Sequence, residues 1–582
     1  MFLSVSSEEY LLAAGLLASF IGLLVSLFYS RRDIADALRT SGFRLPQLIA
    51  ALIVVLLFVV VEAYTVKPTQ LLFFDDVIYQ NMAMELLHIG QAVMCNFGTP
   101  TSCFAGQIFH EPVGTALNLA IGYAIGGMHL TTTYGTDLAI SALAVFMTII
   151  CGSLLFKNNS AALFSGIFMA LAPIMLVWAL PTTSDMPALL YALIALFSLL
   201  VFVKARSNAS FAMLLFSSAL LTYMKVDAIA MLPVLLIGFF LLSGRNPIRH
   251  IKSLYSKKYS DIVYILVIIF LALVAISAVY VYSESLVDNF GSQGTVVPNS
   301  CGFSQSITAT GPFSSKIFLS NICANVGFFL GSYNSQRIMQ PALYAVLAAV
   351  GAAVMLRERK GALPFVFLWF IVFFVIYTAF YAGAVTFGID WRFMLADIAP
   401  LCLAAGYGAE KLSALFAEDL RYAARKTKSL FSRLSGERAV RTAVRGGILL
   451  LALYSFIGFI PALSIQPSQI QQAGDARFYE SFVFNNSDAI PASCLVFSYD
   501  PTLFLINNRS SAQMFYLYNS TFMQNATKHY SCLVEDRGFW CYTPNNLCTN
   551  INKTYDATPI VTAEYGQQGK TFGFYYLTPS RK

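Results

Sequence analysis

Apolar residues in this chain occur in long uninterrupted runs, and the polar and charged residues collect between them. Runs of about 18 or more uncharged residues are typical of membrane-spanning helices, because the hydrocarbon layer is about 30 Å thick. The pattern predicts a polytopic α-helical membrane protein with about twelve or thirteen transmembrane helices. The predicted spans cover residues 10–29, 47–64, 138–156, 161–180, 186–203, 211–224, 228–242, 262–282, 342–356, 362–384, 393–407 and 447–465.

Basic residues between these runs predict the orientation, since short cytoplasmic loops are enriched in Lys and Arg. They cluster at 31–44, 245–258, 357–360 and, most densely, 421–445. With these loops inside, the first long loop (67–136), the second long loop (283–341) and everything after residue 465 lie on the outer face.

The apolar segment 113–130 does not fit this alternation of inner and outer loops. It holds four glycines, which disfavour a regular helix. We expect the segment to lie against the outer face or to re-enter the membrane without crossing it. A plain membrane span is the alternative.

The composition changes after residue 465 and divides the chain into three parts. We predict an extra N-terminal anchor helix with a basic cytoplasmic loop (1–46), a transmembrane domain (47–465), and an extracytoplasmic soluble domain of α/β or β-rich type (466–582). Alternating segments at 494–499, 514–518 and 571–577 predict strands in the last part. Its Asn-x-Ser/Thr sequons favour an exterior, glycosylated domain. They begin at Asn485, Asn508, Asn519, Asn525 and Asn552.

The cysteines agree with this topology. Cys151 and Cys402 lie within apolar runs, and the others lie in segments assigned to the outer face: Cys95, Cys103, Cys301, Cys323, Cys494, Cys532, Cys541 and Cys548. An even set confined to the outside predicts disulfides in an oxidising compartment. Short sequence separation favours the pairs Cys95–Cys103 and Cys301–Cys323, with other connectivities open. A zinc site is disfavoured, because no Cys-x-x-Cys motif is present.

Composition supports the membrane prediction and excludes one partner class. Charged residues make up 12% of the chain, about half the share typical of soluble proteins. The net charge of +7 is explained by the cytoplasmic loops. We therefore expect membrane lipids rather than nucleic acid as partners.

Two adjacent carboxylates, Asp75 and Asp76, stand in the first outer loop just beyond the span 47–64. Acids at a membrane edge are costly to keep charged and are functional candidates by default. One of them can take the proton from an acceptor hydroxyl. Either can instead hold a divalent metal such as Mg²⁺ or Mn²⁺ facing a phosphate, and no other cofactor is indicated. Helix capping is the structural alternative, since Asp is favoured at helix starts.

Further charged residues recur on the same predicted face. His110 and Glu111 lie in the first outer loop, Asp185 and Lys225 lie at later outer helix junctions, and Arg392 opens a late helix. Cations at this face can hold the phosphate of a lipid carrier. A single such cation is more often an interfacial snorkelling residue, so the shared placement carries the prediction.

The order of these motifs resembles that of the GT-C glycosyltransferases, the class of the protein O-mannosyltransferases and the aminoarabinose transferases of lipid A. The acidic pair Asp75-Asp76 matches the pair that those families carry early in the first outer loop. The other resembling elements are, in chain order, His110-Glu111-Pro112-Val113, Thr183-Ser184-Asp185-Met186-Pro187, Leu221 to Lys225, and Arg392-Phe393 with Pro400 downstream. The chain departs from the family pattern at Glu111, Val113 and Phe393, and by two residues between Thr222 and Lys225. The Trp-Trp-Asp motif of oligosaccharyltransferases is absent, which argues against transfer of a whole glycan to Asn.

The resemblance implies an inverting glycosyltransferase, a hexosyl- or pentosyltransferase such as a mannosyltransferase. Its donor would be a sugar on polyprenyl or dolichyl phosphate, and its acceptor a hydroxyl of a protein, lipid or glycan on the outer face. The implied location is a multi-pass cell membrane of archaeal type, or an endomembrane lumen for a eukaryotic source.

The resemblance also implies roles for single residues. Asp75 would be the catalytic base, with Asp76 supporting it. Lys225 and Arg392, helped by His110, would neutralise the leaving phosphate. The remaining supporting residues would be Tyr79, Glu111 and Asp185.

The rival class is a polytopic transporter or a flippase for lipid-linked sugars. Such proteins place charges near the middle of the membrane and are often built from repeated halves. The predicted helices have mostly uncharged centres and no evident repeat, which favours the transferase.

Overall fold

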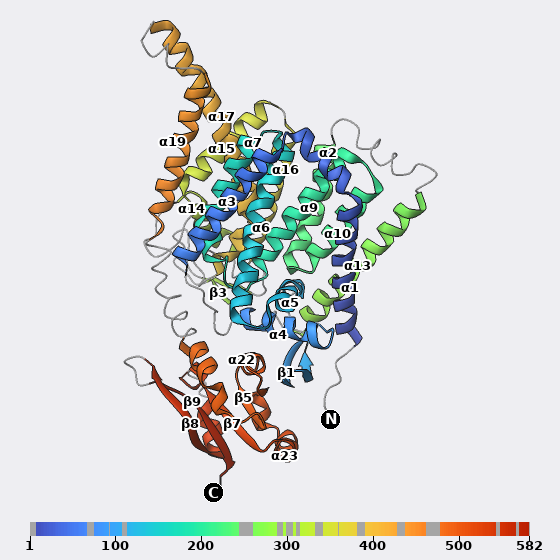
Figure 1. Cartoon of the computed structure of the whole chain (residues 1–582), viewed down its shortest axis with the longest axis vertical. Coiled ribbons are helices and arrows are strands. Elements are labelled where there is room, and N and C mark those ends of the chain that lie inside the picture. The colour runs from blue at the N-terminus through green and yellow to red at the C-terminus, as the bar shows by residue number, and fades with distance from the viewer. Residues whose placement is uncertain are drawn as a thin grey trace.

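The computed structural model consists of a helical body and a C-terminal sheet domain that lies at one end of it (Figure 1). It describes residues 7–66, 75–91, 93–107, 113–243, 260–287, 295–297, 307–309, 313, 315–331, 341–358, 360–380, 390–427, 437–460, 478–542, 547–565 and 570–580.

The helical body is built mainly from helices that follow one another along the chain. In chain order its elements are α1 (Ser7–Tyr29), α2 (Arg31–Ser41), α3 (Leu45–Thr65), α4 (Asp75–His88), α5 (Gly114–Gly126), α6 (Leu130–Phe156), α7 (Asn159–Ala170), α8 (Pro173–Val177), α9 (Asp185–Ala205), α10 (Asn208–Thr222), η1 (Val226–Ala230), α11 (Met231–Leu242), α13 (Ser260–Val287), β3 (Thr295–Val297), β4 (Ile307–Ala309), α14 (Ser315–Phe329), α15 (Ala342–Arg357), α16 (Ala362–Ala379), η2 (Asp390–Met394), α17 (Leu395–Thr427) and α19 (Glu437–Ile457). The short strands β3 and β4 pair with each other alone.

The prediction of a polytopic membrane protein is confirmed. Within the described residues, six helices are long and apolar enough to cross a membrane: Tyr10–Tyr29, Leu45–Thr65, Leu130–Phe156, Asp185–Ala205, Ala362–Ala379 and Ala439–Ile457. Other predicted spans are apolar helices of 10–17 residues: Asn159–Ala170, Asn208–Thr222, Val226–Leu242, Ile265–Ser277 and Ala342–Arg357.

Some predicted spans differ in detail from the structure. The run 161–180 is divided into α7 and α8, because Pro173 has no N–H to continue the helical ladder and begins a new helix. The run 393–407 is only the first half of α17, which continues with polar residues to Thr427. The segment 113–130 contains α5, whose 13 residues extend about 20 Å, less than the hydrocarbon thickness.

Small residues bring α15 and α17 close together. A Cβ on Gly408 would meet the carbonyl oxygen of Leu347, and a Cβ on Gly351 would meet the carbonyl oxygen of Ala404. Helices in membranes pack through such contacts, because lipid removes the hydrophobic drive between them. The packed pair holds α17, and therefore the η2 turn before it, against the body.

The C-terminal domain has a mixed sheet covered by short helices. Its elements are η3 (Ser487–Ala489), β5 (Cys494–Ser498), α22 (Thr502–Ile506), β6 (Ser510–Gln513), η4 (Met514–Tyr518), α23 (Ser520–His529), β7 (Cys532–Arg537), η5 (Phe539–Tyr542), α24 (Leu547–Thr554), β8 (Tyr555–Tyr565) and β9 (Lys570–Pro579). β5 pairs in parallel with β6 and β7, and β9 pairs antiparallel with β7 and β8. The predicted strands at 494–499 and 571–577 are confirmed. The predicted strand 514–518 is wrong: it is a 3₁₀ turn in which Met514 and Leu517 point into the domain core.

The sheet is completed by the first outer loop. That loop forms the hairpin β1 (Met94–Thr99) and β2 (Ser102–Gln107), and β1 pairs antiparallel with β6. The strand order is therefore β2-β1-β6-β5-β7-β9-β8. Phe97 and Ala105 of the hairpin belong to the hydrophobic core of the C-terminal domain. The first outer loop and residues after 478 thus lie on the same end of the helical body, as predicted.

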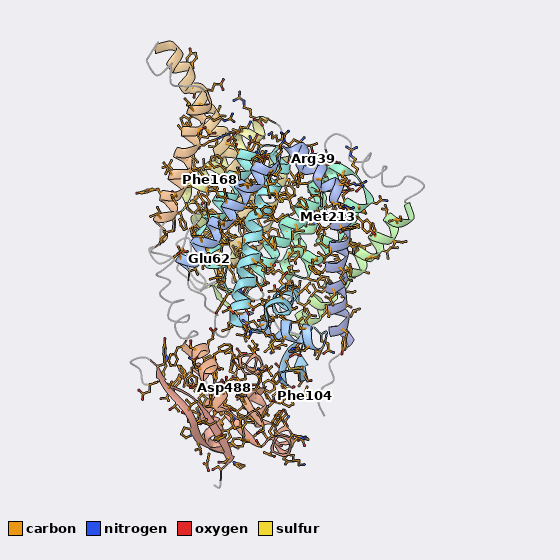
Figure 2. The ribbon with its side chains drawn as sticks, in the orientation of Figure 1. Arg39, Glu62, Phe104, Phe168, Met213 and Asp488 are labelled. Carbon is orange, nitrogen blue, oxygen red and sulfur yellow. A yellow bond between two sulfur atoms is a disulfide. The ribbon has the colours of Figure 1, made fainter. Side chains whose placement is uncertain are left out.

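The basic α2 helix lies at the opposite end. Figure 2 shows Arg39 at the end of the body far from Phe104 and Asp488. The positive-inside rule would place this basic end inside and the sheet domain outside, and that orientation stays a prediction.

The disulfides follow the predicted topology. Cys95 pairs with Cys103, Cys494 with Cys532 and Cys541 with Cys548. Cys323 is disulfide-bonded as well, while its predicted partner Cys301 lies outside the described residues. Cys151 and Cys402 are free and buried, as expected for residues in apolar runs.

The sequons remain predicted glycosylation sites. Asn485, Asn508, Asn519 and Asn525 are exposed. The side chain of Asn519 also caps α23 by accepting a hydrogen bond from the Phe522 N–H. The side chain of Asn552 lies outside the described part of the chain.

Candidate active site

Four charged residues from three segments of the chain meet at helix ends in the body. We call Asp185, Lys225, Asp227 and Arg392 the charge cluster. Asp185 is the first residue of α9, Lys225 precedes η1, Asp227 lies within η1, and Arg392 lies in η2. The cluster therefore depends on the fold and not on one local motif.

Lys225 is at the centre of the cluster. Its Nζ donates to Asp185 Oδ1 at 2.7 Å and to the Tyr377 hydroxyl at 3.0 Å, and it lies 3.5 Å from Asp227 Oδ2. Arg392 Nε lies 3.5 Å from the other oxygen of Asp185. Asp185 therefore bridges the two cations, and its side chain is only 3% exposed.

Aromatic rings line the two cations. Lys225 Nζ lies 4.9 Å from the centroid of Tyr377 and 4.5 Å from that of Phe393. The Arg392 guanidinium lies 5.9 Å from the centroid of the Trp178 ring. Cation–π contacts of this kind stabilise a partly desolvated positive charge. They keep both cations in place without neutralising them.

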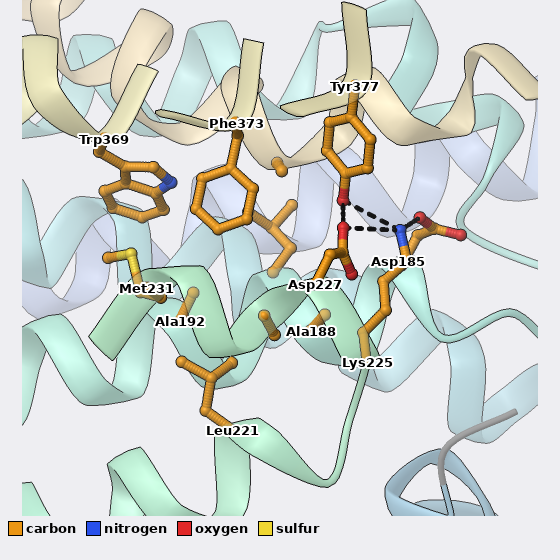
Figure 3. A pocket seen from close by; sticks show the side chains of 13 residues that line it. Asp185, Ala188, Ala192, Leu221, Lys225, Asp227, Met231, Trp369, Phe373 and Tyr377 are labelled. Atoms are coloured by element: carbon orange, nitrogen blue, oxygen red, sulfur yellow. Dashed lines mark hydrogen bonds and ion pairs between the residues drawn. The ribbon is translucent and has the colours of Figure 1, made fainter. Parts of the chain in front are cut away.

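A cavity opens beside the charge cluster (Figure 3). Its empty space, including the opening, measures about 360 Å³. The residues lining it are Asp185, Ala188, Leu189, Ala192, Leu221, Lys225, Asp227, Ala228, Met231, Trp369, Phe373, Tyr377 and Ala396. One end is charged, and the rest is apolar.

The apolar part of the cavity follows the helices away from the charged end. Trp369 precedes Tyr377 by eight residues on α16, which corresponds to about 12 Å along the helix axis. Ala192 follows Asp185 by seven residues on α9, or about 10 Å. The cavity thus joins a charged group at the helix ends to an apolar wall within the membrane-spanning layer.

A second acidic group lies on the other side of the 181–187 turn. Asp137 of α6 accepts a hydrogen bond of 2.6 Å from Thr182, and Asp76 of α4 is close enough to interact with it electrostatically. Asp76 and Asp137 are both buried. Because Thr182 and Asp185 belong to the same turn, this turn connects the acidic group to the charge cluster.

The start of α5 packs against the segment that carries Lys225. The Gly114 N–H donates to the Tyr223 carbonyl at 2.8 Å, and a Cβ on Gly114 would meet that carbonyl and the sulfur of Met224. The end of the first outer loop is therefore held next to the charge cluster.

The structure brings together three of the predicted site residues: Asp185, Lys225 and Arg392. Asp75 begins α4, but its side chain lies outside the described part of the structure, as do His110 and Glu111. Tyr79 is fully buried in α4, one turn after Asp76. The roles assigned to these residues stay predictions.

Sequence reasoning missed three residues of this region. Asp227 was visible two residues after Lys225, Asp137 directly precedes the predicted span 138–156, and Tyr377 lies within the predicted span 362–384. An acid at a membrane edge is a recognised signal of function, so Asp137 was detectable. A tyrosine near the end of a span is common at membrane interfaces, so Tyr377 gave no distinctive signal.

The described residues offer one compact group of metal-type ligands, and it lies apart from the charge cluster. It consists of Glu85, Cys95 and Cys103, and its two sulfurs are joined in a disulfide. Within the described part of the chain, Asp76 belongs to no group of three ligating side chains. The described side chains therefore do not by themselves form a coordination shell at the acidic pair.

Comparisons with known proteins agree on the type of fold. A family model described as dolichyl-phosphate-mannose-protein mannosyltransferase matches residues 110–282, which include Asp137, Asp185, Lys225 and Asp227. No curated protein matches the chain significantly.

Among solved structures, the apo form of ArnT from Cupriavidus metallidurans is 14% identical, with a TM-score of 0.52 over 90% of this chain and 97% of that one. ArnT bound to undecaprenyl phosphate is also 14% identical, with a TM-score of 0.49 over 92% of this chain and 98% of that one. The archaeal oligosaccharyltransferase AglB from Archaeoglobus fulgidus, in complex with an inhibitory peptide and a dolichol-phosphate, is 12% identical, with a TM-score of 0.49 over 92% and 74%. The likeness to apo ArnT shows that this chain shares the fold of that protein.

Proposed function

We propose that this protein is an inverting glycosyltransferase that moves a sugar from a polyprenyl- or dolichyl-phosphate carrier to an acceptor hydroxyl outside the membrane. The observation that carries the proposal is the cavity with a charged end and an apolar wall. A lipid-phosphate sugar has the same division, since its phosphate is anionic and its chain is a hydrocarbon.

The charged end suits a leaving phosphate. Lys225 and Arg392 lie at the helix ends with aromatic faces around them. As the bond between the sugar C1 and the phosphate oxygen breaks, the electron pair and the negative charge pass to the phosphate. Fixed cations in a site of low dielectric constant stabilise such developing charge better than water does. These two residues would supply that stabilisation.

The acidic pair Asp75-Asp76 is suited to act on the acceptor hydroxyl that attacks the sugar C1. In an inverting displacement the acceptor oxygen forms a bond to C1 on the face opposite the phosphate, and its proton passes to a base. Asp75 at the start of α4 is the proposed base, and Asp76 supports it. A divalent metal held by Asp75 or Asp76 stays an alternative role for the pair, and no step proposed here depends on it.

The helix-end position of the charges argues against the transporter alternative. Asp185 begins α9, and Tyr377 is the third residue from the end of α16. A transport site would place charges near the bilayer middle. The charge cluster instead lies where a membrane-embedded donor and a water-soluble acceptor can both reach it.

The proposal is tested by following label from a panel of radiolabelled lipid-phosphate sugars in membranes that contain the purified protein. The family match makes mannose the first sugar to try. Wild type should release the sugar from its carrier, and Asp75→Asn should not. Carrier consumption that is equal in both proteins would remove Asp75 as the base. Translocation of intact donor without consumption would replace the transferase proposal with the flippase.

A further inference from the structure

Counted over the described side chains, the charge cluster is electrically neutral, because two cations face two carboxylates. An anion that approaches a neutral group of charges gains little net attraction. The proposed donor carries one negative charge on its phosphodiester, and the product phosphomonoester carries about −1.5 to −2 at pH 7. The phosphate would therefore bind more tightly if one of the two carboxylates moved away from the cations.

Asp185 is the more firmly held of the two. It accepts a 2.7 Å hydrogen bond from Lys225, lies 3.5 Å from Arg392, and is 3% exposed. It also begins α9, a helix that is largely buried in the body. Moving it would break contacts to both cations at once.

Asp227 is held more loosely. Its Oδ2 lies 3.5 Å from Lys225 Nζ, longer than a hydrogen bond, and its side chain is 19% exposed. Its Oδ1 is buried without a hydrogen-bond partner. The residue sits on a single 3₁₀ turn that follows an extended Lys225, and its Oδ2 accepts a hydrogen bond from the Tyr377 hydroxyl.

The groups around Asp227 Oδ2 are hydrogen-bond donors of the kind that bind a phosphate oxygen. The Tyr377 hydroxyl donates to this oxygen, and the Lys225 ammonium lies on the same side of it. Both groups line the cavity, next to its apolar wall (Figure 3). An ammonium and a hydroxyl that converge on one anionic oxygen form a charge-assisted donor set of the kind phosphates use.

We propose that the Asp227 carboxylate holds the place of a phosphate oxygen in the ligand-free protein, and that the lipid phosphate displaces it. This inference rests on the proposed function. On binding, the phosphate takes the donors of Lys225 and Tyr377, and Asp227 turns toward the cavity opening. After the sugar has left, the returning carboxylate competes with the spent lipid phosphate for the same donors and speeds its release.

Asp227 is thus a positioning residue that sets how tightly the carrier is held. The replacement Asp227→Asn removes the competing charge and keeps an oxygen that can accept from Tyr377. We expect this variant to bind the spent carrier roughly tenfold more tightly, equivalent to about 1.4 kcal/mol. The KM for the donor and kcat should both fall, because the donor binds more tightly and the product leaves more slowly. A merely structural role for Asp227 would not tighten binding.

The experiment measures binding of radiolabelled undecaprenyl monophosphate, and of uncharged undecaprenol, to the full-length protein in nanodiscs. Glu358 offers a matched control carboxylate. It accepts from the Tyr407 hydroxyl at 2.6 Å and from Lys411, but it lies between α15 and α16, where Arg357 and Lys360 mark a predicted cytoplasmic loop. Glu358→Gln should bind the monophosphate as wild type does.

The expected result is tighter binding of the monophosphate by Asp227→Asn, with undecaprenol binding unchanged. Asp227→Ser, which also removes the charge, should tighten binding in the same direction if the Asn variant does not fold. Asp227→Glu should stay close to wild type. Unchanged or weaker monophosphate binding by both neutral variants overturns the placeholder role while wild-type sugar transfer still stands. No monophosphate binding by wild type, together with no sugar transfer, overturns the proposed function as well.

Discussion

Asn81 joins the helix that carries the acidic pair to the C-terminal domain, and its replacement by alanine tests that connection. Its Oδ1 accepts from the Cys95 N–H of β1 at 2.6 Å, and its Nδ2 donates to the Thr502 hydroxyl of α22 at 3.0 Å. A longer contact of 3.4 Å reaches the Cys95 carbonyl. Asn81 is fully buried, so water cannot replace these partners.

The magnitude follows from the groups left without partners. In Asn81→Ala the buried Cys95 N–H is unpaired, which costs about 1–3 kcal/mol, and the lost bond to Thr502 adds about 1 kcal/mol. The connection should therefore weaken by about 2–4 kcal/mol. Since 1.4 kcal/mol is a factor of ten, the β1–β6 pairing should open between about thirtyfold and several hundredfold more often.

Hydrogen exchange measures this opening directly. Peptides that cover β1 and β6 should lose protection in Asn81→Ala by the factor given above. Asn507→Ala is the matched control, because the Asn507 amide also donates to a backbone carbonyl but only within α22, to Leu503. The reasoning is refuted if β1 and β6 keep their protection in Asn81→Ala, or if the control loses as much.

Three further predictions follow from other parts of the structure. Lys225→Met removes a charge about 4 Å from the phosphate site, an interaction worth about 4 kcal/mol at an effective dielectric constant of ~20. The kcat/KM for the donor should therefore fall about a thousandfold. A variant that keeps about a tenth of the wild-type kcat/KM would contradict this prediction. Burial raises the pKa of Asp536 to about 7, above the ~3.9 of an unfolded aspartate, so the folded domain binds the proton more tightly. The stability of the folded domain should therefore be greatest below about pH 4 and should fall by up to about 4 kcal/mol as the pH rises to about 7. Hydrogen exchange of β5 and β7 measures this change, and Asp536→Asn should abolish it. Gly408→Leu should lower the thermal stability in detergent, because the new side chain meets the Leu347 carbonyl, whereas Gly447→Leu, with open space around it, should not.

The helical part of the fold was largely predictable, because long apolar runs admit few alternatives in a membrane. The exceptions have local physical causes, such as the break at Pro173 between α7 and α8. The hairpin β1–β2 was not predicted. Its sequence from Met94 to Thr99 contains Asn and Gly, which are poor strand formers. It becomes a strand because β1 pairs with the edge of β6 and because Phe97 packs into the core of the C-terminal domain.

The site was predictable where charge alone defines it. Asp185, Lys225 and Arg392 lie at helix ends on one predicted face, and residues that share one membrane interface are confined to a narrow layer in which they can meet. The partner that completes the group was not predictable. Tyr377 reaches Lys225 and Asp227 only because α16 packs beside α11, and helix adjacency cannot be read from hydropathy.

The C-terminal domain is part of the proposed catalytic apparatus. Asp76 and Asn81 lie on the same helix, a little more than one turn apart, and Asn81 is fixed by β1 and α22. The orientation of the acidic pair relative to the charge cluster thus depends on a sheet in which β1 pairs with β6, a strand more than 400 residues later in the sequence. Because β1 pairs with β6 and Phe97 is buried among residues of the C-terminal domain, removing that domain would expose an apolar strand and release α4 from its anchor. The helical body alone is therefore not expected to retain the geometry that proton transfer requires.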